Sequence, residues 1–281
     1  MKNKVYPSIK DAILLLLVFW AAYYGFGKLN GALISALKIS GGLFIGVLNF
    51  INITISFGLV LLIGFKKSKR EFNAVFKFNK VPLFLWAAAT VFIIGFDILL
   101  SDYVSFLTPF FPISERLLKF SKEVDGQYFI IVVIRVVIIG TAAEEMLFRG
   151  LILGGLKTRY TNRKAVIISA LLFGLYHFNP FQFCLAFVMG LFSAWLCIRT
   201  GSILLSIYLH MYYNLTAMVF FRFRNIVTIP GYNVITSYFV YEPFWFHFTG
   251  LVLFILGIVL LKKGFKKQKL ELNRPVNAPQ P

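Results

Sequence analysis

Long apolar runs limit what this chain can fold into more than any other feature. Runs such as "AILLLLVFWAAYYGFG" at positions 12–27 recur along almost the whole sequence. About 20 apolar residues at 1.5 Å each cross a ~30 Å hydrocarbon core. The mean hydropathy of +0.79 and the low share of charged residues, 14%, agree with this interpretation. We therefore predict an all-α, polytopic integral membrane protein, with residues 1–281 forming a single membrane domain.

The runs divide the chain into about eight predicted transmembrane helices. The fifth and sixth are short and are separated by "FNPFQ", so a tight turn at Asn179 and Pro180 should join them. The basic start and first run resemble a secretory signal without a convincing cleavage site, and we expect a retained first helix. The expected helices cover residues 11–29, 43–65, 82–107, 127–156, 165–178, 181–198, 202–221 and 244–261.

Positive charge is distributed as a membrane topology signal. The net charge is +18, but the 29 Lys and Arg residues lie mostly in short clusters between apolar runs, which argues against nucleic-acid binding. With the N-terminus inside, 20 of them fall on the inner side and seven on the outer side, while Arg135 and Arg149 lie within helices. This bias predicts that both termini are cytoplasmic. Residues 262–281 should form a basic, disordered cytoplasmic tail.

Other segments give weaker indications. "FPISERLLKFSKEVDG" at 111–126 suits either a short interfacial helix on the outer face or an ordinary solvated loop helix. Cys184 and Cys197 lie in one predicted helix, ~20 Å apart by helical rise and so beyond disulfide reach. His247 should be an interfacial residue among aromatic side chains. Arg135 should snorkel or pair with an aspartate of the third helix, either Asp97 or Asp102.

The stretch "TAAEEMLFRG" at 141–150 places two glutamates and an arginine in an apolar setting. Glu145 and Arg149 are four residues apart on one helical face, so we expect an ion pair between them. Glu144 points about 100° away and has no such partner in its helix. An ionisable carboxylate in a membrane helix is costly and marks a functional site by default.

Two further motifs, "FGLYHF" and "LHMYYN", place His177, His210 and Asn214 in neighbouring helices. Each alone suits ordinary hydrogen bonding between helices. However, Glu144 lies 13 residues before Lys157, and His177 lies 13 residues after Lys164, the two lysines bounding one basic loop. In an antiparallel hairpin both would therefore lie ~20 Å below the surface, and His210 at ~16 Å. We expect these groups to meet at one depth.

A carboxylate, two imidazoles and an amide at one depth allow three kinds of chemistry. Glu144 could act as general base for hydrolysis, with His and Asn donors stabilising an oxyanion. Glu144, His177 and His210 could instead bind zinc, leaving a fourth position for water. The groups could also line an ion or proton pathway. The sequence contains no HExxH, GxSxG or P-loop pattern, so the commoner hydrolase and NTPase mechanisms have no support.

At these residues the sequence resembles the CAAX protease and bacteriocin-processing (CPBP or Abi) family of intramembrane proteases, over roughly residues 130–220. Its EExxxR, FxxxH and HxxxN motifs appear in order as "EEMLFR", "FGLYH" and "HMYYN". The resemblance implies an eight-helix fold and cleavage of a membrane-associated, prenylated or bacteriocin-type peptide, in a bacterial plasma membrane.

Carried over by position, the resemblance assigns a role to each motif residue. Glu144 with His177 would activate water, His210 and Asn214 would form the oxyanion hole, and Glu145 with Arg149 would orient the site. We favour a metal-free mechanism because a zinc site would leave Asn214 without a role. Two alternatives stay open: a non-catalytic peptide-binding or immunity protein on the same scaffold and, with less support from the apolar outer halves of the helices, a transporter.

Overall fold

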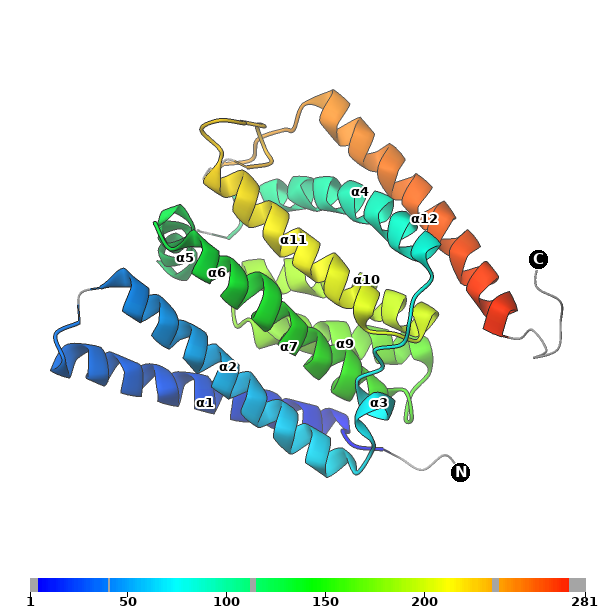
Figure 1. The fold of residues 1–281 in the computed structure, drawn as a ribbon. Coiled ribbons are helices and arrows are strands. Elements are labelled where there is room, and N and C mark those ends of the chain that lie inside the picture. Colours follow the sequence, from blue (N-terminus) through cyan, green and yellow to red (C-terminus); the bar gives the residue numbers. More distant parts are fainter. Residues whose placement is uncertain (1–4, 40, 112–114, 234–237, 273–281) are drawn as a thin grey trace.

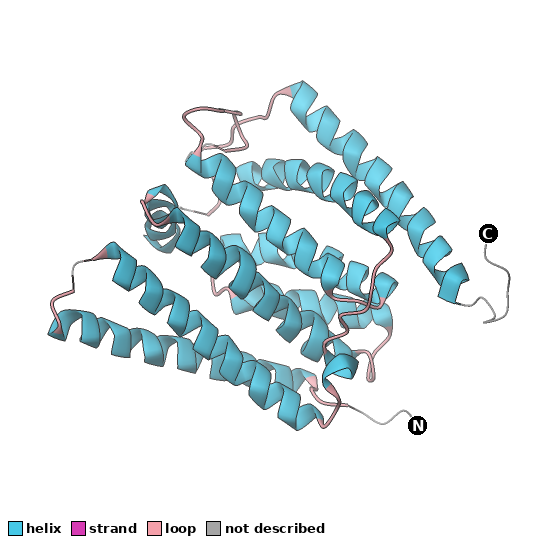
Figure 2. Ribbon diagram, viewed as in Figure 1, coloured by secondary structure: helices cyan, strands magenta, loops and turns pink. Residues whose placement is uncertain are grey.

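The structure is a computed structural model that describes residues 5–39, 41–111, 115–233 and 238–272. Within these ranges it is all-helical and contains no strand, as predicted (Figure 2). The helices are α1 (Ile9–Ala36), α2 (Gly42–Ser68), α3 (Phe72–Val75), α4 (Leu83–Leu107), α5 (Glu115–Asp125), α6 (Phe129–Val133), η1 (Ile134–Gly140), α7 (Thr141–Glu145), η2 (Met146–Ile152), α8 (Leu153–Leu156), α9 (Asn162–Tyr176), α10 (Pro180–Thr200), α11 (Leu204–Arg222) and α12 (Phe244–Leu272).

The segments α6, η1, α7, η2 and α8 form one continuous helix from Phe129 to Leu156. The residues at its internal junctions, including Thr141 and Met146, have right-handed helical dihedral angles. Two wide π-helical stretches, η1 and η2, flank the five-residue α-helix that carries both glutamates. Consistent with the wide turn, the Thr141 hydroxyl donates to the carbonyl of Val136, five residues earlier. Such turns are rare and often occur at functional sites.

Eight helical segments therefore correspond to the eight predicted membrane helices. Six of them, α1, α2, α4, α10, α11 and α12, are long and apolar enough by length and composition to cross a membrane. The other two are the continuous helix Phe129–Leu156 and α9, which has 15 residues. The predicted turn is confirmed: the Asn179 side chain accepts a hydrogen bond from the amide of Gln182, and Pro180 begins α10.

The predicted disordered tail from residue 262 is wrong in its first half. Helix α12 continues to Leu272, and the rest of the tail, 273–281, lies outside the described residues. The extension is stabilised because Leu261 and Phe265, four residues apart, bury their side chains on the bundle. Gln268 adds a hydrogen bond from its side-chain amide to the carbonyl of Thr200.

The helices are arranged as two outer pairs around a central group (Figure 1). The hairpin α1–α2 covers one side, and α4 packs with α12 on the other; α9, α10, α11 and the continuous helix lie between them. Glycines allow the close contact of α4 and α12, since a Cβ at Gly95 would overlap the backbone of Phe254, and one at Gly257 that of Phe92. The backbones of α4 and α12 are therefore in direct contact at these glycines.

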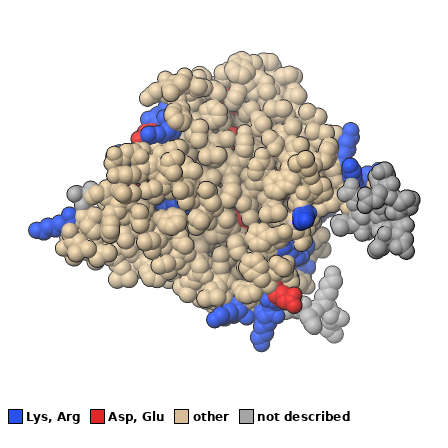
Figure 3. Space-filling view, in the orientation of Figure 1, with Lys and Arg blue, Asp and Glu red and all other residues tan. Residues whose placement is uncertain are grey.

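The outside of the molecule is apolar between charged edges. Large apolar side chains such as Leu29, Ile130 and Phe244 are exposed, as expected for a surface in contact with lipid. In the view of Figure 3, Lys and Arg gather mainly toward the margins, and most of the face between them is uncharged. This distribution supports an integral membrane protein.

Helix α5, predicted at 111–126, is confirmed as a helix. Its end is fixed by the Arg224 guanidinium, which donates two hydrogen bonds of 2.8 and 2.9 Å to the carboxylate of Asp125. Those hydrogen bonds hold the pKa of Asp125 below its usual range. The expected pairing of Arg135 with an aspartate of α4 is wrong, because α5 packs against α6 and brings Glu123 to Arg135 instead.

Candidate active site

The predicted ion pair between Glu145 and Arg149 is confirmed and fully buried. Both side chains have 0% exposure, and Arg149 Nε lies 3.1 Å from Glu145 Oε2. The two atoms are poorly aligned for a hydrogen bond, so their attraction is mainly electrostatic. The guanidinium also donates to the carbonyl of Gly190 and lies 4.7 Å from the centre of the Phe173 ring. Arg149 is thereby held against α9 and α10.

His210 lies between the two glutamates. Its Nδ1 is 3.0 Å from Glu145 Oε1, and its Nε2 is 3.7 Å from Glu144 Oε2. The ring is buried, and it reaches the glutamates because α11 packs against α7. Glu144 has no partner in its own helix, as expected, but it does have one across the helix interface. Glu145 has a second partner that the sequence analysis missed, since helical spacing reports only neighbours in the same helix.

The two glutamates differ in accessibility. The Glu144 side chain is 14% exposed, whereas that of Glu145 is 0% exposed. Glu144 also accepts a hydrogen bond from the buried Tyr176. The backbone carbonyl of Tyr176 accepts a hydrogen bond of 3.0 Å from Trp20 Nε1, so α1 supports this side of the site. Glu144 is therefore the less enclosed of the two carboxylates.

Tyr176 was missed although it directly precedes His177 in the motif "FGLYH". The sequence did contain an indication of Tyr176. Equal depth places Glu144 opposite His177, and Tyr176 is the residue directly before His177. His177 directly follows the last residue of α9 and is half-buried, with its ring 5.3 Å from that of Phe173 and 5.0 Å from that of Tyr176. It joins the group through these aromatic rings.

Asn214 enters the site through Thr141, a residue that the sequence analysis did not select. The Asn214 side-chain amide donates a 3.0 Å hydrogen bond to the hydroxyl of Thr141, one turn before the glutamates. The Phe173 ring is 5.5 Å from that of His210, which connects α9 to α11. Side chains from the continuous helix, α9 and α11 therefore meet, as predicted from depth alone.

Comparison with known proteins gives a match at this region. Residues 126–216 match the family model of type II CAAX prenyl endopeptidase Rce1-like, a span that contains all six candidate residues. This segment is an Rce1-like domain of the CPBP family. A search of curated proteins finds no match, and a search of solved structures finds none either. Membership of this family implies an intramembrane protease that acts on a peptide.

The residues of the Rce1-like domain do not fit a metal as they are arranged. The ligand atoms of Glu144, His177 and His210 do not gather within 4.8 Å of one another, whereas another group of described residues meets that limit. The Nδ1 of His210 is engaged by Glu145, which leaves only Nε2 on the side of Glu144. We therefore derive no step that involves a metal at this centre.

Proposed function

We propose that the protein is an intramembrane endopeptidase that hydrolyses a peptide bond in a membrane-associated or lipid-modified peptide. The observation that carries this proposal is the contrast between the two glutamates within an Rce1-like domain. Glu145 is enclosed by Arg149 and His210, while Glu144 keeps partial exposure beside them. An accessible carboxylate with fixed donors around it is the arrangement that general-base hydrolysis needs.

In this mechanism Glu144, assisted by His177, takes a proton from a water molecule. The water oxygen forms a bond to the carbonyl carbon of the substrate, and the carbonyl oxygen becomes an oxyanion. His210 and Asn214 stabilise that oxyanion. The C–N bond then breaks, and the proton held by Glu144 passes to the leaving amine nitrogen. Water is thus divided between the two peptide products, and Glu144 returns to its starting state.

Glu145 and Arg149 act as positioning residues. Glu145 accepts from Nδ1 of His210 and so directs Nε2 toward Glu144. Asn214 is held one turn away by Thr141.

The remaining features of the proposal follow from the sequence. The distribution of basic residues supports cytoplasmic positions for both termini, and we propose a bacterial plasma membrane as the location. The substrate class is a prenylated CAAX-type or bacteriocin-type peptide, and no resident cofactor is needed. The alternative is a non-catalytic peptide-binding or immunity protein on the same scaffold. Cleavage of a peptide by the wild-type protein in the following experiment would exclude it.

The test uses full-length protein in liposomes and a fluorogenic farnesylated CAAX peptide, with a bacteriocin leader peptide as second substrate. Glu144→Gln should lower the rate of cleavage by about 10²–10⁴-fold, the usual contribution of a general base. The matched control is Glu115→Gln, because the side chain of Glu115 is 91% exposed on α5. Cleavage by Glu144→Gln at the wild-type rate would refute the assigned role.

A further inference from the structure

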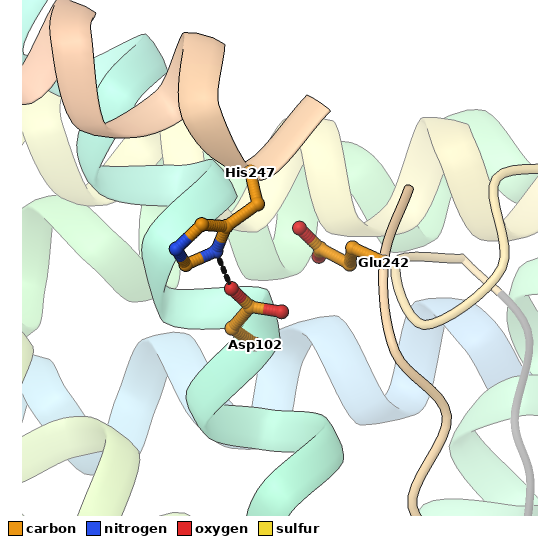
Figure 4. Close-up of side chains that lie close together, drawn as sticks. All are labelled: Asp102, Glu242 and His247. Atoms are coloured by element: carbon orange, nitrogen blue, oxygen red, sulfur yellow. Dashed lines mark hydrogen bonds and ion pairs between the residues drawn. The ribbon is translucent and has the colours of Figure 1, made fainter. Parts of the chain in front are cut away.

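A second group of polar side chains lies outside the Rce1-like domain, where α4 meets α12. Asp102 is on α4, Glu242 is in the segment before α12, and His247 is in the first turns of α12. One ligand atom from each lies within 4.8 Å of the others. Figure 4 shows the Glu242 carboxylate directed toward the paired His247 and Asp102. The sequence analysis expected His247 to lie among aromatic side chains and did not identify Asp102 and Glu242 as its neighbours.

Glu242 carries an unsatisfied oxygen into this group. The residue is 7% exposed, and its Oε1 accepts a hydrogen bond from Ser101, but Oε2 is buried without a hydrogen-bond partner. A buried carboxylate oxygen without a donor is costly. Among the described residues, moreover, no Lys or Arg forms an ion pair with Asp102 or Glu242. Asp102 and Glu242 therefore have no Lys or Arg partner among the described residues, although His247 lies beside them.

From this geometry we propose that Asp102, Glu242 and His247 bind a divalent transition-metal ion, with zinc as the best match. One imidazole nitrogen and two carboxylate oxygens form a donor set that zinc accepts, with water in the fourth position. The ion would supply the missing partner of Glu242 Oε2. It would also separate Asp102 from His247, which touch directly without it.

The required movement is small. Tetrahedral ligands at ~2.0–2.2 Å from zinc are about 3.4 Å apart, so donors within 4.8 Å need to shift by about an ångström. The side chains of His247 and Asp102 are 45% and 25% exposed, which leaves both free to rotate. Glu242 is held by Ser101 and provides the fixed ligand. The metal would join the segment that precedes α12 to the end of α4, away from the proposed catalytic residues.

The test measures zinc bound to full-length protein purified in detergent with its affinity tag removed. Wild type should bind one zinc per chain after dialysis, and His247→Gln should lose it, with the dissociation constant rising at least about tenfold. His177→Gln is the matched control, since it changes the other half-exposed histidine and should keep one zinc. Cobalt in place of zinc should give ligand-field absorption in wild type but not in His247→Gln.

A second variant separates loss of metal from loss of fold. Asp102→Asn should also lose the metal while it elutes as wild type in size-exclusion chromatography and melts like wild type without metal. Added zinc should raise the melting temperature of wild type but not that of Asp102→Asn. Absence of stoichiometric zinc from wild type would overturn the proposal. So would zinc retained by His247→Gln but lost by His177→Gln, because the metal would then lie in the Rce1-like domain.

Discussion

Replacement of Arg149 by methionine should test how the charges of the candidate site are held. Among the described residues, Arg149 is the only Lys or Arg that forms an ion pair with Glu145, and the side chains of Arg149 and Glu145 have no exposed area. Removal of one member of a buried pair leaves an uncompensated charge and costs about 3–5 kcal/mol. Since 1.4 kcal/mol is a factor of ten, the ratio of folded to unfolded protein should fall by about 10²–10⁴.

The measurement is unfolding in mixed micelles of a mild detergent and SDS, followed by fluorescence of the four tryptophans. A double-mutant cycle with Glu145→Gln gives the coupling energy. The double variant should be more stable than Arg149→Met alone, because it buries no unpaired charge. Arg224→Met, which breaks an exposed pair with Asp125, should cost no more than about 1 kcal/mol. The reasoning would be refuted if Arg149→Met also cost no more than about 1 kcal/mol. It would also be refuted if the double variant were no more stable than Arg149→Met.

Two further predictions concern the contacts around the site. Gly95→Ala should destabilise the protein by about 1–3 kcal/mol in the same assay, because the added methyl would overlap the backbone of Phe254 and push α12 from α4; unchanged stability would mean that the helices are less tightly packed. Asp125→Asn should cost at most about 1 kcal/mol at pH 7, since both partners are partly exposed. Because Arg224 lowers the folded-state pKa of Asp125, the contribution is present above the unfolded value of about 4 and is lost as pH falls further. The difference in stability between wild type and variant should therefore shrink as the pH falls below about 4, and a difference that stays constant over that range would contradict the assignment.

Features that depend on local sequence were predicted well. Apolar run length located the six helices that are long and apolar enough to cross a membrane, because the membrane thickness sets a minimum length for each of them. The spacing of Glu144 and His177 from Lys157 and Lys164 predicted the register of a hairpin, since antiparallel helices joined by a short loop reach equal depth at equal distances from it. The hydrogen bond between Glu144 and Tyr176 agrees with that register to within one residue.

Features that depend on contacts between distant helices were not predictable. Nothing in the spacing within one helix indicates that His210 reaches Glu145, because that contact is set by how α11 packs on α7. The pairing of Arg135 with Glu123 likewise depends on the direction in which α5 leaves the bundle. The extension of α12 past residue 262 followed from burial of Phe265, although the lysines around it suggested a tail.

The wide turns around the two glutamates make this helix sensitive to its residue count. Each π-helical stretch holds more residues per turn than an α-helix, so the chain before α7 and the chain after it are rotated relative to a regular helix. Deleting one residue between Glu145 and Arg149 would shorten their spacing from four residues to three and bring Arg149 about 1.5 Å nearer along the helix axis. A substitution at the same position would leave the spacing intact. The number of residues between Glu145 and Arg149 therefore matters to the site separately from the identities of those residues, and relatives that share the site should differ by substitution there rather than by insertion or deletion.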